Sequence, residues 1–257
     1  MFIEERHEKI MEQIRKEGRV TVKELSNFFS VTEDCVRKDL KALEKEGQLK
    51  RTYGGAVLSR DYPLRRDVID RREVNGEKKE AIAAEALLLI RENETIFLDI
   101  STTNIRLARL LVQWNKRLVV VSNMMDILQI LSASREITAV GTGGTVVQTV
   151  NGFLGAEAIS FIEHYSFDRA FLGTCGLDIT DGTVTTLGAE DGMTKKAVLK
   201  SSRHNYLVME NDKFYFNDSY KFAHLDEIDG IITNQLPDGA TMQALEVAGV
   251  TLFAGQS

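Results

Sequence analysis

The sequence predicts an α/β protein in which an N-terminal winged helix-turn-helix domain is joined to a larger α/β/α domain with a mainly parallel sheet. The first sixty residues carry three helical patterns, then a short strand and a Gly-Gly pair. From Glu77 onward, apolar strand patterns alternate with helical ones, as in sheets covered by helices on both faces. The 257 residues exceed one average domain. We therefore expect domains at 1–60 and 77–257, joined by a charged linker at 61–76.

The N-terminal domain begins with three predicted helices. The first has apolar residues at helical spacing, which are Ile3, Ile10, Met11 and Ile14. It ends at Gly18, a connector or small strand follows over Arg19–Val22, and Lys23–Phe29 is long enough for a two-turn helix. Thr32 suits the N-cap of a third helix that ends at Gly47. This third helix has one apolar face, which we expect in the core: Val36, Leu40 and Leu43.

The polar face of the third helix is basic, and recognition helices place their N-terminal half in the major groove of DNA. The residues that we expect at base edges or phosphates are Thr32, Cys35, Arg37, Lys38 and Lys41. Two alternatives stand beside this interpretation. Arg37 also has the spacing to pair with Glu33 on a solvated helix face, and Cys35 suits a small packing position.

A strand and a glycine pair follow the third helix within Gln48–Val57. We expect this hairpin to act as a wing that contacts the DNA backbone, because glycines allow a tight turn to approach closely. The expected contacts come from Lys50, Arg51, Tyr53, Gly54 and Gly55. An ordinary hairpin is the alternative.

The positive charge is confined to one part of an acidic chain. The net charge is −6, yet residues 35–60 carry 7 Lys and Arg against 3 Asp and Glu. Phosphate contact requires only a local excess of positive charge, so the overall acidity does not argue against DNA binding.

The composition also excludes several classes of protein. No apolar run approaches the roughly 20 residues of a membrane helix, and the charged N-terminus is not a signal peptide. Cys35 and Cys175 cannot form a disulfide framework, which indicates a reducing cytoplasm. No second Cys or His lies at ligand spacing, so we expect no metal and no cofactor.

The second domain alternates helices and strands. We expect helices at 77–90, 104–113, 124–131, 195–201 and 241–248. We expect strands at 95–100, 118–122, 136–141, 167–173, 204–210 and 228–233. In parallel sheets of this kind, ligands bind beyond the carboxyl ends of the strands.

Polar residues and glycines lie at or just after the ends of four of these strands. They are Asp99, Ser101, Thr102 and Thr103 after the first, Ser122 and Asn123 after the second, Gly143 and Gly144 after the third, and Gly173 and Gly176 after the fourth. Hydroxyl groups and free N–H groups at helix starts suit an anionic phosphate. Each group alone is typical of a turn or a helix cap, but their convergence at one edge predicts a small-anion site. It is not a P-loop, because the Gly-Lys-Ser/Thr ending is missing.

Charged residues complete the expected site. Asp212 and Lys213 follow a strand directly, while Asp191 and Lys195 lie one helical turn apart. A lysine beside a phosphate acts as a point charge. The alternative for Lys195 is a solvated helix face.

These motifs resemble the DeoR family of bacterial regulators from about Glu4 to Asn234. The N-terminal pattern is carried by Arg6, Ile10 and Ile14, then by Thr32, Cys35, Val36, Arg37, Lys38, Asp39 and Leu40. Cys35 replaces the family's usual Thr, and Tyr53 stands where a His commonly precedes Gly-Gly. The resemblance implies a winged helix-turn-helix domain that binds a double-stranded operator.

The resemblance extends to the family's effector domain, whose fold is similar to that of ribose-5-phosphate isomerase. The matching elements are Asp99 with Ser101, Thr102 and Thr103, Ser122-Asn123, Gly143-Gly144 and Asp212-Lys213. Asp191 replaces the Glu that often precedes the helix Lys, here Lys195. The resemblance implies a transcriptional repressor of sugar-metabolism genes, controlled by a phosphorylated sugar or related metabolite, in a dimer or tetramer.

Two other functions are weighed against this one. A sugar-phosphate isomerase with a fused DNA-binding head would use Asp99, Asp191 or Asp212 as a general base. A metal-sensing regulator would need clustered ligands, and the four histidines are scattered. The basic winged head favours a regulator that is not an enzyme.

Overall fold

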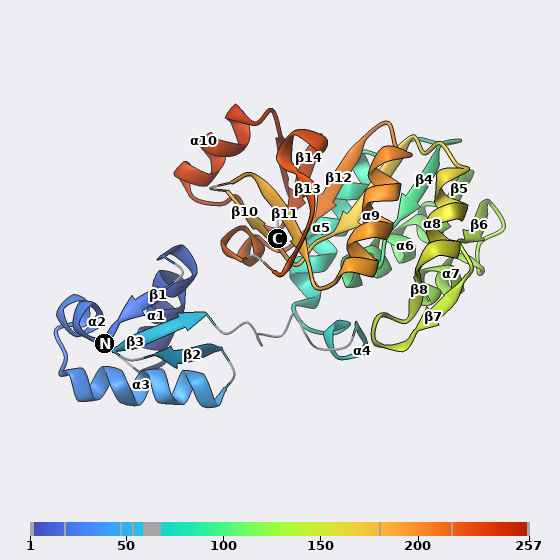
Figure 1. Ribbon diagram of the computed structural model, residues 1–257. Helices are drawn as coiled ribbons and strands as arrows, with labels where there is room; N and C mark the ends of the chain where they lie inside the picture. The colour runs from blue at the N-terminus through green and yellow to red at the C-terminus, as the bar shows by residue number, and fades with distance from the viewer. Residues whose placement is uncertain are drawn as a thin grey trace. The chain divides into compact units, whose positions relative to one another are not determined.

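The computed structural model describes residues 3–17, 19–46, 48–52, 54–58, 68–179, 181–216 and 218–255. It divides into two compact units, Met1–Arg65 and Arg66–Ser257 (Figure 1). The predicted winged helix-turn-helix and mainly parallel α/β folds are both confirmed. The expected helix ends at Gly18 and Gly47, and residues 61–67 of the expected linker, lie outside the described residues.

The N-terminal unit contains three helices and a three-stranded antiparallel sheet of order β1-β3-β2. Its elements are α1 (Ile3–Glu17), β1 (Arg19–Thr21), α2 (Val22–Phe29), α3 (Glu33–Lys45), β2 (Leu49–Thr52) and β3 (Gly55–Leu58). The apolar faces predicted from spacing meet in one core, which includes Ile10, Ile14, Leu25, Val36, Leu40, Leu43 and Leu49.

Local capping interactions set the helix-turn-helix geometry. Thr21 and Glu24 form a reciprocal capping box at the start of α2. Ser30 ends α2 in the left-handed region at φ 53°, and Thr32 caps α3 by accepting the Cys35 N–H at 3.3 Å. The turn between the two helices is therefore closed by residues of its own sequence.

A buried ion pair fastens α3 to α1. The Arg6 Nε and Nη2 groups donate to the two carboxylate oxygens of Asp39 at 2.6 and 2.9 Å. Both side chains are less than one-tenth exposed, and His7 Nε2 lies 3.3 Å from the same carboxylate. Breaking a pair of this kind leaves one uncompensated buried charge, so it holds the third helix in one orientation.

The glycine pair of the wing has an internal structural role. Gly54 is exposed and has φ +85° in the turn. A Cβ at Gly55 would lie 2.0 Å from the Val20 carbonyl oxygen, so only glycine allows β3 to pair with β1 there.

The C-terminal unit is built on a seven-stranded parallel sheet of order β15-β14-β12-β9-β4-β5-β6. Its strands are β4 (Thr95–Leu98), β5 (Leu118–Ser122), β6 (Ile137–Gly141), β9 (Arg169–Gly173), β12 (Asn205–Val208), β14 (Gly230–Thr233) and β15 (Thr251–Ala254). The helices are α4 (Val68–Arg71), α5 (Gly76–Leu88), α6 (Thr102–Trp114), α7 (Met125–Leu131), α8 (Ala156–Glu163), α9 (Ala189–Lys200) and α10 (Gly239–Val247), with short 3-10 turns η2 (Gln148–Val150), η3 (Asn211–Tyr215) and η4 (Leu225–Glu227).

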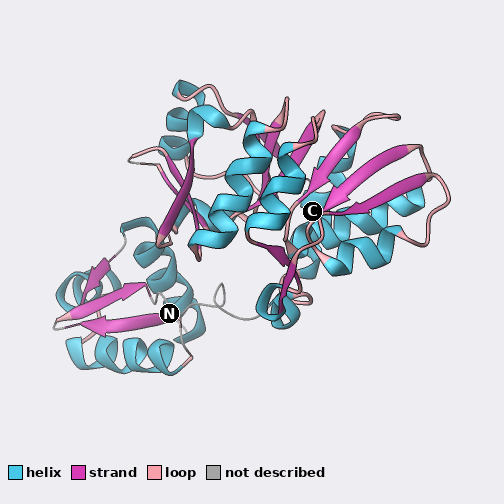
Figure 2. Cartoon of the chain, turned by 45° about the vertical axis from the view of Figure 1, so that its right-hand side comes forward, coloured by secondary structure: helices cyan, strands magenta, loops and turns pink. Residues whose placement is uncertain are grey.

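Helices cover both faces of this sheet (Figure 2). On β4, Ile96 and Leu98 pack with α5, α6 and α7, whereas the intervening Phe97 packs with α8, α9 and α10. Both faces of the central strands are buried, which explains their continuous apolar runs.

Several short elements escaped the sequence prediction. They are the hairpin β7 (Thr145–Val147) and β8 (Gly152–Leu154), the antiparallel sheet of β10 (Gly176–Asp178), β11 (Thr183–Thr186) and β13 (Tyr220–His224), the edge strand β15, and helix α8. β11 is the sequence TVTT, whose buried threonines do not show the apolar signal of a core strand. Helix α9 also begins at Ala189, earlier than the expected start at Lys195.

The second half of the expected linker belongs to the C-terminal unit. Val68 on α4 is fully buried in the core formed by α5, α6 and α7. The many charges of this stretch hid its packing, because they indicated an exposed connector. Residues 68–76 are therefore an ordered segment and not a free tether.

Replacing Asp39 with Ala should lower the free energy of unfolding of the N-terminal unit by about 3–5 kcal/mol, because Arg6 would stay buried without a partner. Denaturant unfolding of the full chain, with hydrogen exchange at α3 amides to assign the transition, measures it. Asp34→Ala, which removes an exposed carboxylate from the same helix, is the control and should change stability by under about 0.5 kcal/mol. Equal effects of the two variants would contradict the assigned role.

Candidate functional site

The arginines of the basic helix and wing are paired with carboxylates. Arg37 lies 2.6 Å from Glu33 and 2.9 Å from Asp34 on α3, with 55% of its side chain exposed. Arg51 on β2 donates from its backbone N and its Nε to Glu44, both at 2.8 Å. The intrahelical pair weighed for Arg37 is therefore present in the DNA-free protein. Exposed pairs are worth under about 1 kcal/mol, so phosphate or base contacts can replace them.

The lysines of α3 are differently placed. Lys38 and Lys41 are exposed, and neither has an ion pair with a described residue. Helix α3 packs beside β2, the first strand of the wing. The Lys50 side chain and the whole of Tyr53 lie outside the described residues.

Cys35 lies partly buried on α3 as a free thiol, near the buried Arg6 guanidinium. Among the described residues, no group of three or more His, Cys, Asp or Glu side chains could hold a metal ion.

The second candidate site lies where the direction of the sheet changes. From β4 the chain runs outward through β5 and β6, then returns to β9 on the other side of β4. Ligands in open α/β sheets bind beyond the carboxyl ends of the strands at such a switch point. Asp99 follows β4 and Gly173 ends β9, and the Gly173 N–H donates to Asp99 Oδ2 at 3.0 Å. A Cβ on Gly173 would approach the Ser101 Cβ to 2.9 Å, so the two strand ends meet without room for a side chain.

Asn104 ties these two strand ends together and was missed among the predicted site residues. Its Nδ2 donates to the carbonyls of Asp99 and Phe171 at 2.9 and 2.8 Å. Asn104 is completely buried in the first turn of α6. The only signal in the sequence was its place directly after Asp99–Thr103, at the start of a helix.

A buried lysine shared by two carboxylates forms the centre of the site. Lys195 is 1% exposed, so its alternative as a solvated residue is wrong. Its Nζ contacts Asp99 Oδ2 and lies 3.3 Å from Asp191 Oδ1. Thr186 donates to the other Asp191 oxygen at 2.6 Å. In contrast, Lys196 is exposed and lies over the Tyr220 ring.

Burial and charge act in opposite directions in this cluster. Burial raises the pKa of Asp99 to about 6, although the Lys195 ammonium acts to lower it. Burial acts to lower the pKa of Lys195, but Asp191 and Asp99 outweigh it and raise that pKa above its ordinary value. The ammonium therefore keeps its proton, while Asp99 gains a proton more easily than an exposed carboxyl group does.

Asn104 Oδ1 is one buried oxygen atom at this edge without a hydrogen-bond partner among the described residues, and Asp99 Oδ1 and Asn123 Oδ1 are two others. Asp99 and Asn123 are completely buried, at the ends of the neighbouring strands β4 and β5. Unpaired buried acceptors are costly. They are positions where hydroxyl or amine groups of a ligand, or water, would donate.

Lys213 brings a second cation to the same edge. Its Nζ donates to the carbonyl oxygen of Thr174, just beyond β9, at 2.7 Å, and burial lowers its pKa. Asp212 points elsewhere, because its Oδ2 lies 3.4 Å from Lys78 on α5. The predicted Asp212-Lys213 pair is therefore split, and Lys213 is the member at the strand ends.

The remaining predicted residues have structural roles at the edge. Ser101 caps α6 by accepting the Thr103 N–H at 3.2 Å. Ser122 donates to the Leu98 carbonyl at 2.7 Å and accepts from Met124 N. Thr102 and Thr103 are buried in the first turn of α6, Gly143 and Gly144 have positive φ after β6, and Gly176 begins β10.

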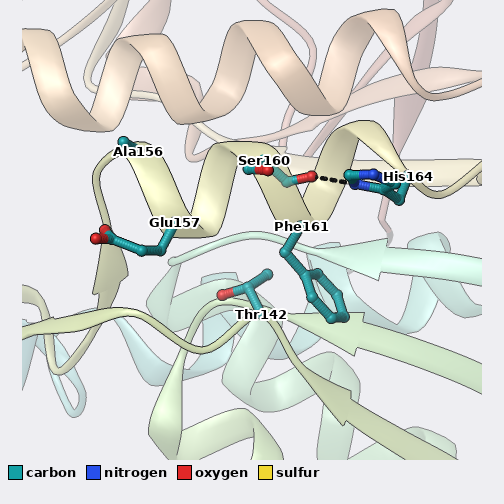
Figure 3. A pocket seen from close by; sticks show the side chains of 6 residues that line it. All are labelled: Thr142, Ala156, Glu157, Ser160, Phe161 and His164. Carbon is teal, nitrogen blue, oxygen red and sulfur yellow. Dashed lines mark hydrogen bonds between the residues drawn. The ribbon is translucent and has the colours of Figure 1, made fainter.

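A hollow of about 560 Å³ lies between α8 and the end of β6. Its lining residues are Thr142, Ala156, Glu157, Ser160, Phe161 and His164 (Figure 3). The His164 ring hydrogen-bonds the Ser160 carbonyl at 2.6 Å. The lining of the hollow contains none of the predicted effector residues and no lysine or arginine. The buried cluster at the strand ends is therefore the better candidate for an anion site.

Comparisons with known proteins identify the family of both parts of the chain. The family model described as DeoR-like helix-turn-helix domain matches residues 6–61, and the model described as DeoR C terminal sensor domain matches residues 74–235. Among solved structures, ribose 5-phosphate isomerase A of Methanocaldococcus jannaschii aligns with 54% of each chain at 17% identity and a TM-score of 0.41. That likeness is too weak to carry an argument about function. Within the described ranges, no helix is both long and apolar enough to cross a membrane.

Curated relatives align along almost the whole chain. The uncharacterized HTH-type transcriptional regulator YulB of Bacillus subtilis is 32% identical over 99% of this chain and 97% of its own. The glycerol-3-phosphate regulon repressor of Escherichia coli is 29% identical over 94% of each chain. The repressor GlcR of Bacillus subtilis is 28% identical over 98% and 96%. These relatives are regulators, which disfavours the isomerase alternative. The chain belongs to the DeoR family of DNA-binding transcriptional regulators.

Proposed function

We propose that this regulator represses sugar-metabolism genes and that a phosphorylated sugar or related metabolite sets its affinity for the operator. The relative from Escherichia coli is named for a glycerol-3-phosphate regulon, which supports this class of metabolite. The single observation that carries the proposal is the polar cluster at the switch point, where Asp99, Asn123, Lys195 and Lys213 meet the carboxyl ends of the strands.

The chemistry of the cluster suits a ligand with a polyol end and an anionic end. Hydroxyl groups would donate to the free oxygens of Asp99 and Asn123, where the described protein offers no donor. The phosphate would lie at Lys213 and at the N-terminus of α6, where N–H groups and the helix dipole favour negative charge.

On the DNA side, Lys38 and Lys41 would contact phosphates, because both are exposed and neither forms an ion pair with a described residue. Arg37 and Arg51 would exchange their carboxylate partners for DNA. Thr32, Cys35, Lys50, Tyr53, Gly54 and Gly55 complete the proposed interface. A homodimer or tetramer in the cytoplasm would place two heads on a repeated or palindromic operator.

Lys38→Ala and Lys41→Ala should each weaken operator binding and lower the slope of log K against log salt by about one. An operator duplex selected from a random pool by the wild-type protein, titrated at several salt concentrations, provides the measurement. Lys200→Ala, an exposed lysine on α9, is the control. Unchanged slopes for both α3 variants would place the DNA interface elsewhere.

A sugar phosphate that binds should stabilise the C-terminal unit by about 2.7 kcal/mol at one hundred times its dissociation constant. A thermal-shift panel of sugar phosphates, their unphosphorylated sugars and inorganic phosphate tests this. Lys213→Met should abolish the shift, whereas Lys196→Met, on the exposed side of α9, should keep it. If no member of a broad panel binds, the effector half of the proposal fails.

The buried Asp99 carboxyl group should make the free energy of unfolding depend on pH, and the direction follows from its raised pKa. Its pKa in the folded protein, about 6, lies above the unfolded value of 3.8, so the folded state holds the proton more tightly. The stability of wild type relative to Asp99→Asn should therefore fall as the pH rises from about 4 to 6, by about 3 kcal/mol at most, and then level off. Urea unfolding of both proteins across this range measures the difference. A difference that grows with pH would mean that attraction to Lys195 outweighs burial.

A further inference from the structure

The ordered segment 68–76 is the stretch of the C-terminal unit that the chain enters from the DNA-binding unit. We call it the bracket. It consists of α4, the turn at 72–75 and the first residue of α5. Its core contact is the fully buried Val68, and α4 packs against η2. The other described side-chain contacts of the bracket set out below are polar.

Charged side chains bind three backbone carbonyls of the bracket. Lys79 Nζ on α5 donates to the carbonyls of Arg71 and Val74 at 2.7 and 2.5 Å. Arg106 Nη2 on α6 donates to the carbonyl of Arg72 at 3.2 Å. Lys79 is only 3% exposed, and this burial lowers its pKa to about 8. Burying an ammonium group costs free energy. Its hydrogen bonds to the bracket carbonyls therefore indicate that the bracket has one preferred conformation.

Side-chain pairs add further ties. Arg72 forms an ion pair with Asp126 on α7 at 2.6 Å, and Asn151 Nδ2 donates to the same carboxylate at 2.9 Å. Asn75 Nδ2 donates to Glu210 at 2.5 Å, and the Glu210 carboxylate also lies 3.9 Å from Lys79 Nζ. Arg106 also contacts Glu73 at 3.0 Å.

The three elements that tie the bracket from the sheet are those that carry the proposed effector site. Arg106 lies one helical turn after Thr102 on α6. Asp126 lies three residues after Asn123, at the start of α7. Glu210 lies three residues before Lys213, whose N–H donates to the Glu210 carbonyl at 3.0 Å. A displacement of any of these strand ends therefore moves a side chain that holds the bracket.

We propose that the bracket is the transmission element of this regulator, with Arg106, Asp126 and Glu210 as its coupling residues. This inference rests on the proposed function and specifies its regulation. Without ligand, the three ties hold the segment that leads to the DNA-binding unit in the arrangement that binds the operator. An anion that draws Lys213 and the start of α6 together displaces Glu210 and Arg106, and the bracket loosens. The ligand acts because it binds the loosened arrangement better than the tied one.

The test uses the full chain and an operator duplex selected from a random pool by wild type. Asp126→Asn and Glu210→Gln keep the size of each side chain and remove its charge. Glu92→Gln is the matched control, because it loses a surface pair with Arg117 at 3.6 Å that lies outside the bracket. Thermal unfolding verifies that each C-terminal unit remains folded.

Without any ligand, Asp126→Asn and Glu210→Gln should bind the operator about 3- to 30-fold more weakly than wild type. The control should bind like wild type, and an Arg72→Gln exchange should reproduce the effect of Asp126→Asn from the other side of the pair. If the bracket variants bind the operator as wild type does, the proposal is overturned, whatever the effector is.

With fructose 1-phosphate, sn-glycerol 3-phosphate and inorganic phosphate as probes, a second arm measures coupling. A probe that weakens wild-type operator binding should have less than about twofold effect on the bracket variants, while its thermal shift persists. The proposal would also be overturned if the probe weakened operator binding of the bracket variants as much as it weakens that of wild type. If no probe affects wild type, the sugar-phosphate proposal loses support, but the ligand-free arm still decides the role of the bracket.

Discussion

The C-terminal unit depends on how it accommodates one buried ammonium group, that of Lys195. Transferring an ion out of water costs several kcal/mol, so the fold must supply partners wherever α9 places this side chain. Asp99 arrives from the end of β4, and Asp191 from one turn earlier on α9. The need to pair the Lys195 ammonium group therefore holds α9 against the switch point of the sheet. Because two carboxylates share one cation, the cluster keeps an excess acceptor, Asp99 Oδ1, that the described protein does not satisfy.

The N-terminal unit also contains a buried ion pair, which orients a helix. Arg6 and Asp39 are 33 residues apart in sequence and form a bidentate pair beneath the recognition helix. Replacing a buried pair with apolar residues is often neutral or stabilising, so neither pair is explained by stability alone. What each pair specifies is orientation. Asp39 faces the core and fixes the rotation of α3, so that Arg37, Lys38 and Lys41 are presented to solvent.

Patterns of short range were readable in the sequence, whereas pairings across the chain were not. The apolar spacing of Val36, Leu40 and Leu43 follows from helix geometry, and the buried strands follow from their apolar runs. By contrast, nothing local distinguishes Lys195, which is buried, from Lys196, which is exposed, because the difference arises from the packing of α9 against α8 and the strands β9, β11 and β13. The charged segment 68–76 indicated a linker for the same reason. Its carbonyls are bound by Lys79 and Arg106, and such partners become visible only in the fold.

These partners explain why a highly charged segment can carry information between two sites. An apolar contact can slide with little change in energy, but a carbonyl bound by a buried ammonium group cannot shift without leaving that ammonium group short of a hydrogen-bond partner. The bracket thus has few acceptable positions, and a small movement at Lys213 or Thr102 selects among them instead of being absorbed. The charges of residues 68–76 indicated an exposed connector, yet polar ties to this segment are what give it discrete states.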